Sequence, residues 1–354
     1  MTREERIAAL NADVSQRILV LDGAMGTEVQ ALNLSESEFR GDRFAGHSHD
    51  LKGNHDILNL TAPEIVQEIH ENYFDAGADI VATNTFNASS ISQADYGTQD
   101  HVYEINRIGA QLARDAAAAT MSAQTGRQCW VAGAIGPTNK TTSISPDVND
   151  PGFRAISFDE IKDVYKEAVR GLIDGEADLL LIETIFDTLN AKACLFGVEE
   201  LFEENGFRIP VMVSGTITDL SGRTLTGQTP EAFWYSVRHA QPFSIGLNCS
   251  MGAREMRAYV AAISQVADTL VCAYPNAGLP NEFGQYDEGP ESTADYLSEW
   301  ATSGLVNIVG GCCGTTPDHI RAIKAKVENV APRSVPNVDV EMHLSGLEAF
   351  AVPA

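Results

Sequence analysis

The sequence predicts a single-domain (β/α)₈ barrel of the TIM type, an α/β fold, and three observations lead to this expectation. Eight short apolar segments alternate along the chain with longer segments of helical period. The apolar segments lack the polar–apolar alternation of a half-exposed strand, which is typical of parallel strands buried on both faces. No G-x-G-x-x-G loop follows any of them, so the competing doubly wound sheet is not favoured.

The eight expected strands are short and almost wholly apolar. They are Ile18–Leu21, Ile80–Thr83, Trp130–Ala134, Leu179–Glu183, Val211–Ser214, Ile245–Asn248, Leu270–Ala273 and Val306–Val309. The segment 61–77 is a typical helix, because Pro63 stands at its start and Gly77 at its end. The other helices are expected at roughly 102–120, 159–174, 188–204, 229–239, 252–267, 292–303 and 317–328.

The barrel is expected to occupy residues 1–330. Residues 331–354 contain several prolines and no helical period, so they are expected to be a linker-like tail. Two connections, about 22–62 and 136–158, are too long to be simple turns. Both follow strands, at the end of a barrel where enzymes build their active sites.

Composition excludes several classes of function. Lys and Arg total 24 against 49 Asp and Glu, and the net charge of -25 argues against binding to nucleic acid or to an anionic membrane surface. The chain has no apolar run long enough to span a membrane, and its N-terminus does not have the pattern of a signal peptide. Six cysteines in 354 residues are too few for a disulfide scaffold, so a cytoplasmic location is expected.

Three of the cysteines are expected to meet at the mouth of the barrel. Cys249 directly follows the sixth expected strand, and Cys312 and Cys313 follow the eighth. Neighbouring cysteines make a strained disulfide, whereas three converging thiolates suit Zn²⁺. Three protein ligands leave the fourth zinc position open for a substrate. The alternative, that a cysteine is simply a small buried apolar residue, stays open for any one of them.

Motifs at nearly every expected strand carry a resemblance to a known family. They are "DGAMGTEVQ", "GADIVATNTF", "GPTNKTTSISPDVNDP", "ETIFDTLNAKA", "GLNCSMG", "YPNAGLPN" and "GGCCGTTPDHI". Together they resemble the homocysteine S-methyltransferase family, and within it the homocysteine-binding module of cobalamin-dependent methionine synthase. The resemblance implies a zinc-bearing barrel that binds homocysteine as a thiolate and methylates it to methionine. It also implies that Cys249, Cys312 and Cys313 are the catalytic zinc ligands.

Homocysteine also needs partners for its ammonium and carboxylate groups. Six residues are expected to supply them or to complete the site: Asp22, Ala24, Met25, Gly26, Glu183 and Asn276. Glu183 is expected to pair with the ammonium, or else to be a structural carboxylate. The backbone N–H groups of Ala24, Met25 and Gly26 are expected to hold the substrate carboxylate. Asp22 either orients their loop or shares the ammonium, and Asn276 either caps the metal or forms a turn.

The methyl donor is the least constrained part of the expectation. The chain contains no D-x-H-x-x-G cobalamin loop, and "LSGLEAF" near its end resembles the junction to the folate module of the synthase. The resemblance therefore implies methylcobalamin carried on a partner polypeptide with folate- and cobalamin-binding modules, this chain being a split subunit or an excised module. A stand-alone enzyme that uses S-methylmethionine, S-adenosylmethionine or betaine is the nearest alternative. A non-catalytic zinc-binding assembly subunit is an alternative of another class.

Overall fold

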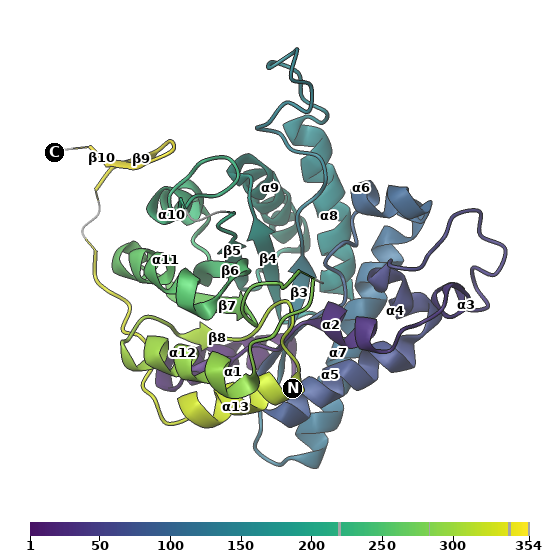
Figure 1. Ribbon diagram of the computed structural model, residues 1–354, viewed down its shortest axis with the longest axis horizontal. Helices are drawn as coiled ribbons and strands as arrows, with labels where there is room; N and C mark the ends of the chain where they lie inside the picture. The colour runs from purple at the N-terminus through teal and green to yellow at the C-terminus, as the bar shows by residue number, and fades with distance from the viewer. Residues whose placement is uncertain (219–220, 283, 339–340, 353–354) are drawn as a thin grey trace.

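The computed structural model describes residues 1–218, 221–282, 284–338 and 341–352. Eight parallel strands form a ring that helices surround (Figure 1). The strands are β1 (Leu19–Val20), β2 (Ile80–Ala82), β3 (Trp130–Ile135), β4 (Leu179–Ile185), β5 (Val211–Gly215), β6 (Ser244–Gly252), β7 (Leu270–Asn276) and β8 (Ile308–Val309). The predicted (β/α)₈ barrel is confirmed. β1 and β8 are shorter than expected, whereas β4, β6 and β7 continue further toward the mouth.

The barrel closes between β1 and β2 through a short seam. The Asp22 N–H donates to the Ile80 carbonyl at 3.0 Å, and the Asp79 N–H donates to the Val20 carbonyl at 2.7 Å. Two carboxylates add to these bonds: Asp79 accepts from the Val20 N–H and Asp22 accepts from the Ala82 N–H, each at 2.9 Å. Side chains therefore help to join a strand that is only two residues long.

All eight expected helices are present, each after its strand. They are α5 (Pro63–Ala76), α7 (Val102–Ala123), α8 (Phe158–Asp174), α9 (Thr188–Asn205), α10 (Pro230–Val237), α11 (Ala253–Val266), α12 (Pro290–Thr302) and α13 (Pro317–Val327). Local signals set their ends. α5 begins at Pro63 and stops at Gly77, whose φ of 110° is left-handed. Within the described ranges, no helix has both the length and the apolar character needed to cross a bilayer.

The two long connections differ in structure. The first contains the short helices α2 (Met25–Ala31), α3 (Glu36–Arg40) and α4 (Leu58–Thr61), which the sequence did not predict. The second, residues 136–157, has neither helix nor strand and extends away from the barrel above α8 (Figure 1). A further short helix, α6 (Ser90–Gln93), follows β2.

The strands are buried on both faces, which explains their continuous apolar character. One set of side chains fills the barrel interior: Leu19, Leu21, Ile80, Trp130, Ala132, Leu179, Leu181, Met212, Cys272, Tyr274 and Ile308. The alternate residues pack against the surrounding helices, as Val20, Val81 and Val131 do. The interior is therefore a packed core, and open space is left only at its ends.

An unpredicted helix, α1 (Arg3–Gln16), lies across the N-terminal end of the barrel. Thr2 and Glu5 form a capping box that starts it. Leu10 and Val14 are its buried apolar residues and belong to the interior core. Ile7 and Ala9 are only partly buried against the core, so the helix has a narrow apolar face and a weak periodic signal in the sequence.

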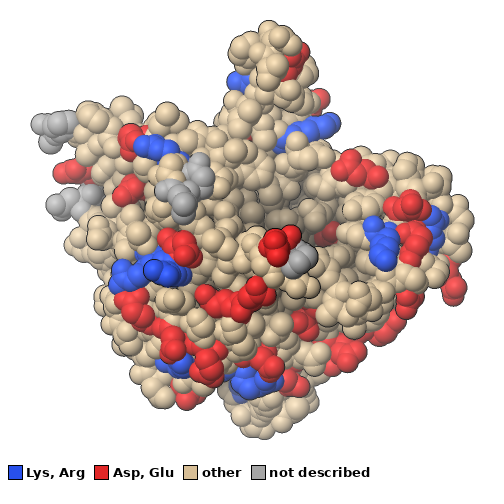
Figure 2. Space-filling view, in the orientation of Figure 1, with Lys and Arg blue, Asp and Glu red and all other residues tan. Residues whose placement is uncertain are grey.

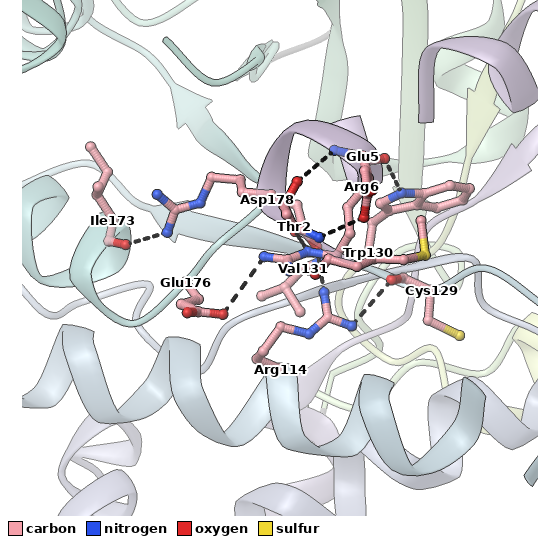
Figure 3. A network of polar contacts seen from close by, with 12 residues as sticks. Thr2, Glu5, Arg6, Arg114, Cys129, Trp130, Val131, Ile173, Glu176 and Asp178 are labelled. Carbon is pink, nitrogen blue, oxygen red and sulfur yellow. Dashed lines mark hydrogen bonds and ion pairs between the residues drawn. The ribbon is translucent and has the colours of Figure 1, made fainter. Parts of the chain in front are cut away.

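A buried carboxylate connects α1 to the strands (Figure 3). Asp178, just before β4, is fully buried and accepts hydrogen bonds from the guanidinium groups of Arg6 and Arg114. It also accepts from the Val131 N–H at 2.9 Å, while the Trp130 indole donates to the Arg6 carbonyl at 2.9 Å (Figure 3). One side chain thus joins α1, α7, β3 and β4.

The tail after α13 packs back onto the barrel. Arg333 is buried, and its guanidinium donates to the Ser264 and Ala267 carbonyls, both at 2.7 Å, at the end of α11. Further on, β9 (His343–Ser345) and β10 (Ala349–Ala351) form a hairpin beside α10. Residues 339–340 and 353–354 of the tail lie outside the described residues, and the domain boundary at 330 stays a prediction.

We expect Asp178→Ala to destabilise the fold by about 3–5 kcal/mol, because it leaves two buried guanidinium groups without their carboxylate. Urea denaturation measures this effect. Glu299→Ala is the control, since the Arg257–Glu299 pair is about half exposed and is worth at most about 1 kcal/mol. Equal effects of the two substitutions would contradict the role of the buried network.

Candidate functional site

A cavity of about 650 Å³ lies at the C-terminal ends of the strands. Figure 2 shows a hollow near the centre of this face, surrounded mostly by uncharged residues. Among the described residues that line the cavity there is no lysine or arginine, although the carboxyl groups of Asp22, Asp56 and Glu183 line it. The charged groups that a ligand meets among these lining residues are therefore acidic, which favours a ligand with a positively charged group.

The three cysteines predicted to converge lie together in this cavity. The Sγ atoms of Cys249 and Cys313 are 3.7 Å apart, and those of Cys312 and Cys313 are 4.0 Å apart. All three sulfurs lie within 4.8 Å of one another, and each residue is partly exposed. Within the described part of the chain, no other group of metal-ligating side chains converges in this way. Cys129, Cys194 and Cys272 are buried elsewhere.

Irregular backbone brings Cys249 to this point. The pairing of β6 with β7 shifts after Asn248, and Cys249 and Ser250 have φ angles of 60° and 61°. Left-handed backbone is uncommon for residues other than glycine and costs about 1–3 kcal/mol at each position. The bulge turns the Cys249 side chain toward the end of β8.

A tight turn after β8 presents the cysteine pair. The Cys312 N–H donates to the Pro275 carbonyl at 2.8 Å, and the Cys313 carbonyl accepts from the Ala277 N–H at 2.9 Å. Gly314 follows with a φ of 82°, a conformation that glycine adopts without strain. Hydrogen bonds to the end of β7 therefore hold both cysteines against the neighbouring strand.

The thiols of the cluster are electrostatically unequal. Hydrogen bonds from Cys249 and Cys312 hold the pKa of Cys313 well below its usual range. The Tyr286 hydroxyl, in the loop after β7, also hydrogen-bonds to Cys313 and acts in the same direction. The same contacts and burial raise the pKa of Cys312. These contacts therefore favour ionisation of Cys313 over that of Cys312. The sequence did not predict Tyr286, although it lies between the two cysteine-bearing strands in the chain.

Glu183 lies in a second bulge, at the end of β4. The pairing of β4 with β5 shifts between Ile182 and Ile185, and Thr184 has a φ of 56°. The carboxylate of Glu183 accepts a hydrogen bond from the Tyr274 hydroxyl at 3.1 Å. Burial raises the pKa of Glu183 to about 7, although the Tyr274 hydrogen bond opposes the shift. Its carboxyl group is poised to change charge near neutral pH.

The loop after β1 forms the wall beside the cysteine pair. Asp22 is buried, which raises its pKa well above its usual range, and its carboxylate accepts from the Ala82 N–H. α2 begins at Met25, after Ala24. The Ala24 N–H donates to the Thr315 hydroxyl at 3.3 Å, whereas the N–H groups of Met25 and Gly26 begin a helix and have no partner within it.

Asn276 ends β7 and does not line the cavity, although its backbone pairs with that of Gly252. It is 2% exposed, and its Oδ1 has no hydrogen-bond partner among the described residues. Its carbonyl accepts from the Gly278 N–H at 2.8 Å, as in a turn. The unpartnered Oδ1 is compatible with capping of a metal, and the carbonyl contact is compatible with a turn, so both expectations for Asn276 stay predictions.

Asp56 is a further acidic residue of the cavity that the sequence did not reveal. It lies in the 3₁₀ helix η1 (His55–Ile57), and its carboxylate accepts from the Asn87 N–H at 2.9 Å. Burial raises its pKa to about 7. No motif distinguishes it in the sequence, because its burial depends on the folding of the long first loop.

Comparison with known proteins agrees with this architecture. A family model described as homocysteine S-methyltransferase matches residues 19–327. The structure resembles homocysteine methyltransferase MmuM from Escherichia coli in its oxidized form, with a TM-score of 0.70 and 23% identity over 92% of this chain and 100% of that chain. The metallated form of MmuM gives a TM-score of 0.69 and 25% identity, over 91% and 99%. The family match includes all eight strands and the three clustered cysteines.

The raised pKa of Glu183 predicts a pH-dependent stability. A carboxyl group whose pKa is higher in the folded protein stabilises the fold at acidic pH, and this contribution disappears as the pH rises through about 7. Between pH 5 and pH 8 the metal-free wild type should therefore lose about 2.5 kcal/mol more than Glu183→Gln, which cannot ionise. Urea midpoints across this range measure the difference, with Glu299→Gln, at a half-exposed position, as control. Parallel pH profiles of wild type and Glu183→Gln would contradict the shift.

Proposed function

Because the chain belongs to the homocysteine S-methyltransferase family, we propose that it methylates homocysteine to methionine at a zinc ion held by Cys249, Cys312 and Cys313. We further propose that the methyl group comes from methylcobalamin on a partner polypeptide. The observation that carries the proposal is the convergence of three thiols at the mouth of the barrel.

The spacing of the sulfurs fits a tetrahedral zinc site. With Zn–S bonds of about 2.3 Å, two thiolates of such a site stand about 3.8 Å apart. The 3.7 Å and 4.0 Å separations within the cluster are close to this value. The metallated form of MmuM, a homocysteine methyltransferase of the same fold, is in keeping with a metal in this family.

Zinc held by three thiolates supplies one open position, where a substrate thiol is kept deprotonated at neutral pH. The surrounding residues prepare the cluster for the ion. Cys313 already has a lowered pKa, so it is available as a thiolate before a metal arrives. A reducing cytoplasm suits such a site, because it keeps the three thiols free.

We assign the ammonium group of homocysteine to Glu183. The Tyr274 hydroxyl orients its carboxylate, and an approaching ammonium favours the ionised form of a carboxyl group whose pKa is about 7. The N–H groups of Met25 and Gly26, with that of Ala24 once it leaves Thr315, are the donors proposed for the substrate carboxylate. Asp22 holds the main chain of β2, which favours an orienting role for it.

Asn276 remains a candidate for the open metal position in the absence of substrate. Its buried Oδ1 has no partner among the described residues, and a buried amide oxygen without one is costly. A metal that Asn276 capped in the absence of substrate would remove this cost.

Exposed apolar side chains around the mouth support a protein partner. Large apolar residues of the loops after β2, β3, β5 and β7 are exposed: Phe86, Ile144, Val148, Phe153, Leu225 and Leu279. Val148, in the projecting loop after β3, is 91% exposed. Of these residues, Phe86 lines the cavity, and exposed apolar side chains on loops at this end of the barrel are in keeping with docking of a partner there.

One observation favours the stand-alone alternative. The chain covers 99% of metallated MmuM, so a barrel of this size forms essentially the whole chain of a homocysteine methyltransferase. In that case a small donor such as S-methylmethionine, S-adenosylmethionine or betaine would enter the same cavity. A non-catalytic assembly subunit would bind zinc without methylating homocysteine.

The chain should bind about one zinc ion, and Cys312→Ala should weaken zinc binding more than about a hundredfold, because two thiolates are too few ligands. Metal analysis after dialysis against a chelator measures this. Cys194→Ala, in a buried cysteine of α9, is the control and should retain the metal. Full zinc occupancy without Cys249, Cys312 and Cys313 would refute the site.

Glu183→Gln should reduce the affinity of the zinc-loaded protein for homocysteine about ten- to a hundredfold, since a charge-assisted hydrogen bond to the ammonium is lost. Calorimetric titration measures the affinity, and the zinc content should not change. An unaltered affinity would return Glu183 to a structural role.

The donor can be tested directly with the purified chain. Methylation of homocysteine by free methylcobalamin should be slow, and a polypeptide with cobalamin- and folate-binding modules should speed it about a hundredfold or more, since docking raises the effective concentration of the donor. Turnover with S-methylmethionine, S-adenosylmethionine or betaine, and none with methylcobalamin, would instead establish the stand-alone enzyme. Zinc binding without turnover on any donor would point to the assembly subunit.

A further inference from the structure

Both halves of the proposed substrate site lie on strand irregularities. Glu183 lies where β4 departs from its register with β5, and Cys249 lies where β6 departs from its register with β7. Thr184 and Cys249 have left-handed φ angles of 56° and 60°. The regular strand ladder therefore fixes neither side chain, and other contacts must hold the two bulges in relation to each other.

The side chain of Asn248 makes those contacts. Its Oδ1 accepts a hydrogen bond from the Thr184 N–H at 3.0 Å and another from the Ser214 hydroxyl at 2.7 Å. Its Nδ2 donates to the Thr184 hydroxyl at 2.8 Å. Because a backbone N–H can only donate, the Asn248 Oδ1 must be the atom that faces the Thr184 N–H. This contact fixes which way the amide group is turned.

These bonds join strands that are not neighbours in the barrel. β5 lies between β4 and β6, so the ladder connects them only indirectly. Asn248 reaches across β5, where it meets Ser214, and holds the residue that follows Glu183. In its own strand it directly precedes Cys249. Asn248 is fully buried and does not line the cavity, so it does not touch a ligand there.

We propose that Asn248 is a positioning residue that fixes the distance between the carboxylate of Glu183 and the sulfur of Cys249, and thereby selects the chain length of the amino-acid thiol. The inference rests on the proposed function, since it assumes that the metal holds the substrate sulfur while Glu183 holds its ammonium. A fixed distance favours homocysteine over cysteine, which is one methylene shorter. A variable distance admits both.

Binding of three thiols to the zinc-loaded protein tests this role. Homocysteine and cysteine engage both positions, whereas propanethiol engages only the metal. In Asn248→Ala the ratio of homocysteine affinity to cysteine affinity should fall about tenfold, the usual effect of one methylene, while propanethiol affinity changes less than about twofold. Calorimetry gives all three affinities without turnover.

Asn307→Ala is the matched control. Asn307 is also a buried asparagine, and its side chain bonds to the Val271 N–H at 2.9 Å and to the Arg333 carbonyl at 2.8 Å. It lies at the N-terminal end of β8, away from the mouth. Its loss should lower stability without changing the ratio. If Asn248→Ala does not fold, Asn248→Ser replaces it, because one hydroxyl cannot replace all three hydrogen bonds of the amide but leaves a smaller cavity than alanine does.

The outcomes separate the two proposals. Two results with the folded Asn248 variant would overturn the positioning role: an unchanged ratio of homocysteine to cysteine affinity, or an equal loss of affinity for all three thiols. A wild type that does not discriminate homocysteine from cysteine would overturn it as well. Each of these results would leave the proposed function intact. A wild type that binds neither zinc nor homocysteine would overturn the proposed function, and this inference with it.

Discussion

Closure of the barrel between β1 and β2 is the constraint on which the site depends. Only when the ring is complete do the ends of β4, β6 and β8 face a common mouth, so that Glu183 and the cysteines can line one cavity. The seam is short, and the carboxylates of Asp22 and Asp79 bind the main chain of the opposite strand across it. Asp22 thus belongs both to the seam and to the cavity wall. Its role in closing the barrel accounts for a buried carboxyl group in the wall of this cavity.

The buried carboxyl groups of the cavity carry a free-energy cost. Burial raises the pKa values of Asp56 and Glu183 toward neutrality, and no lysine or arginine among the described lining residues offsets them. Removing acidic groups from water without a counter-charge is unfavourable. The proposed metal cation and substrate ammonium would relieve this cost, so their binding would also stabilise the folded protein.

Much of this could be predicted from the sequence. Strands buried on both faces appear as apolar runs, and their order alone places Cys249 and Cys312 at one end of a barrel. Helix α1 could not be predicted in this way, since its buried apolar residues are only Leu10 and Val14. Asn248, Asp56 and Tyr286 were missed for a different reason: each matters through a contact with a distant segment, and neither hydrophobic period nor a local motif records such contacts. The pKa of Glu183 likewise depends on burial beside Tyr274, which only the folded chain provides.

The pairing of β1 with β8 also sets the order in which the protein can be completed. Leu19 pairs with Ile308, so β1 can pair with β8 only after the last strand has been synthesised. Contacts between residues so far apart in the sequence form slowly. On the ribosome, where the N-terminal part emerges first, Cys249 is made well before Cys312 and Cys313. A nascent chain therefore exposes one thiol of the cluster at a time, and the trio forms only after nearly the whole barrel has been synthesised. Any metal that needs all three thiols could then bind only at the end of folding.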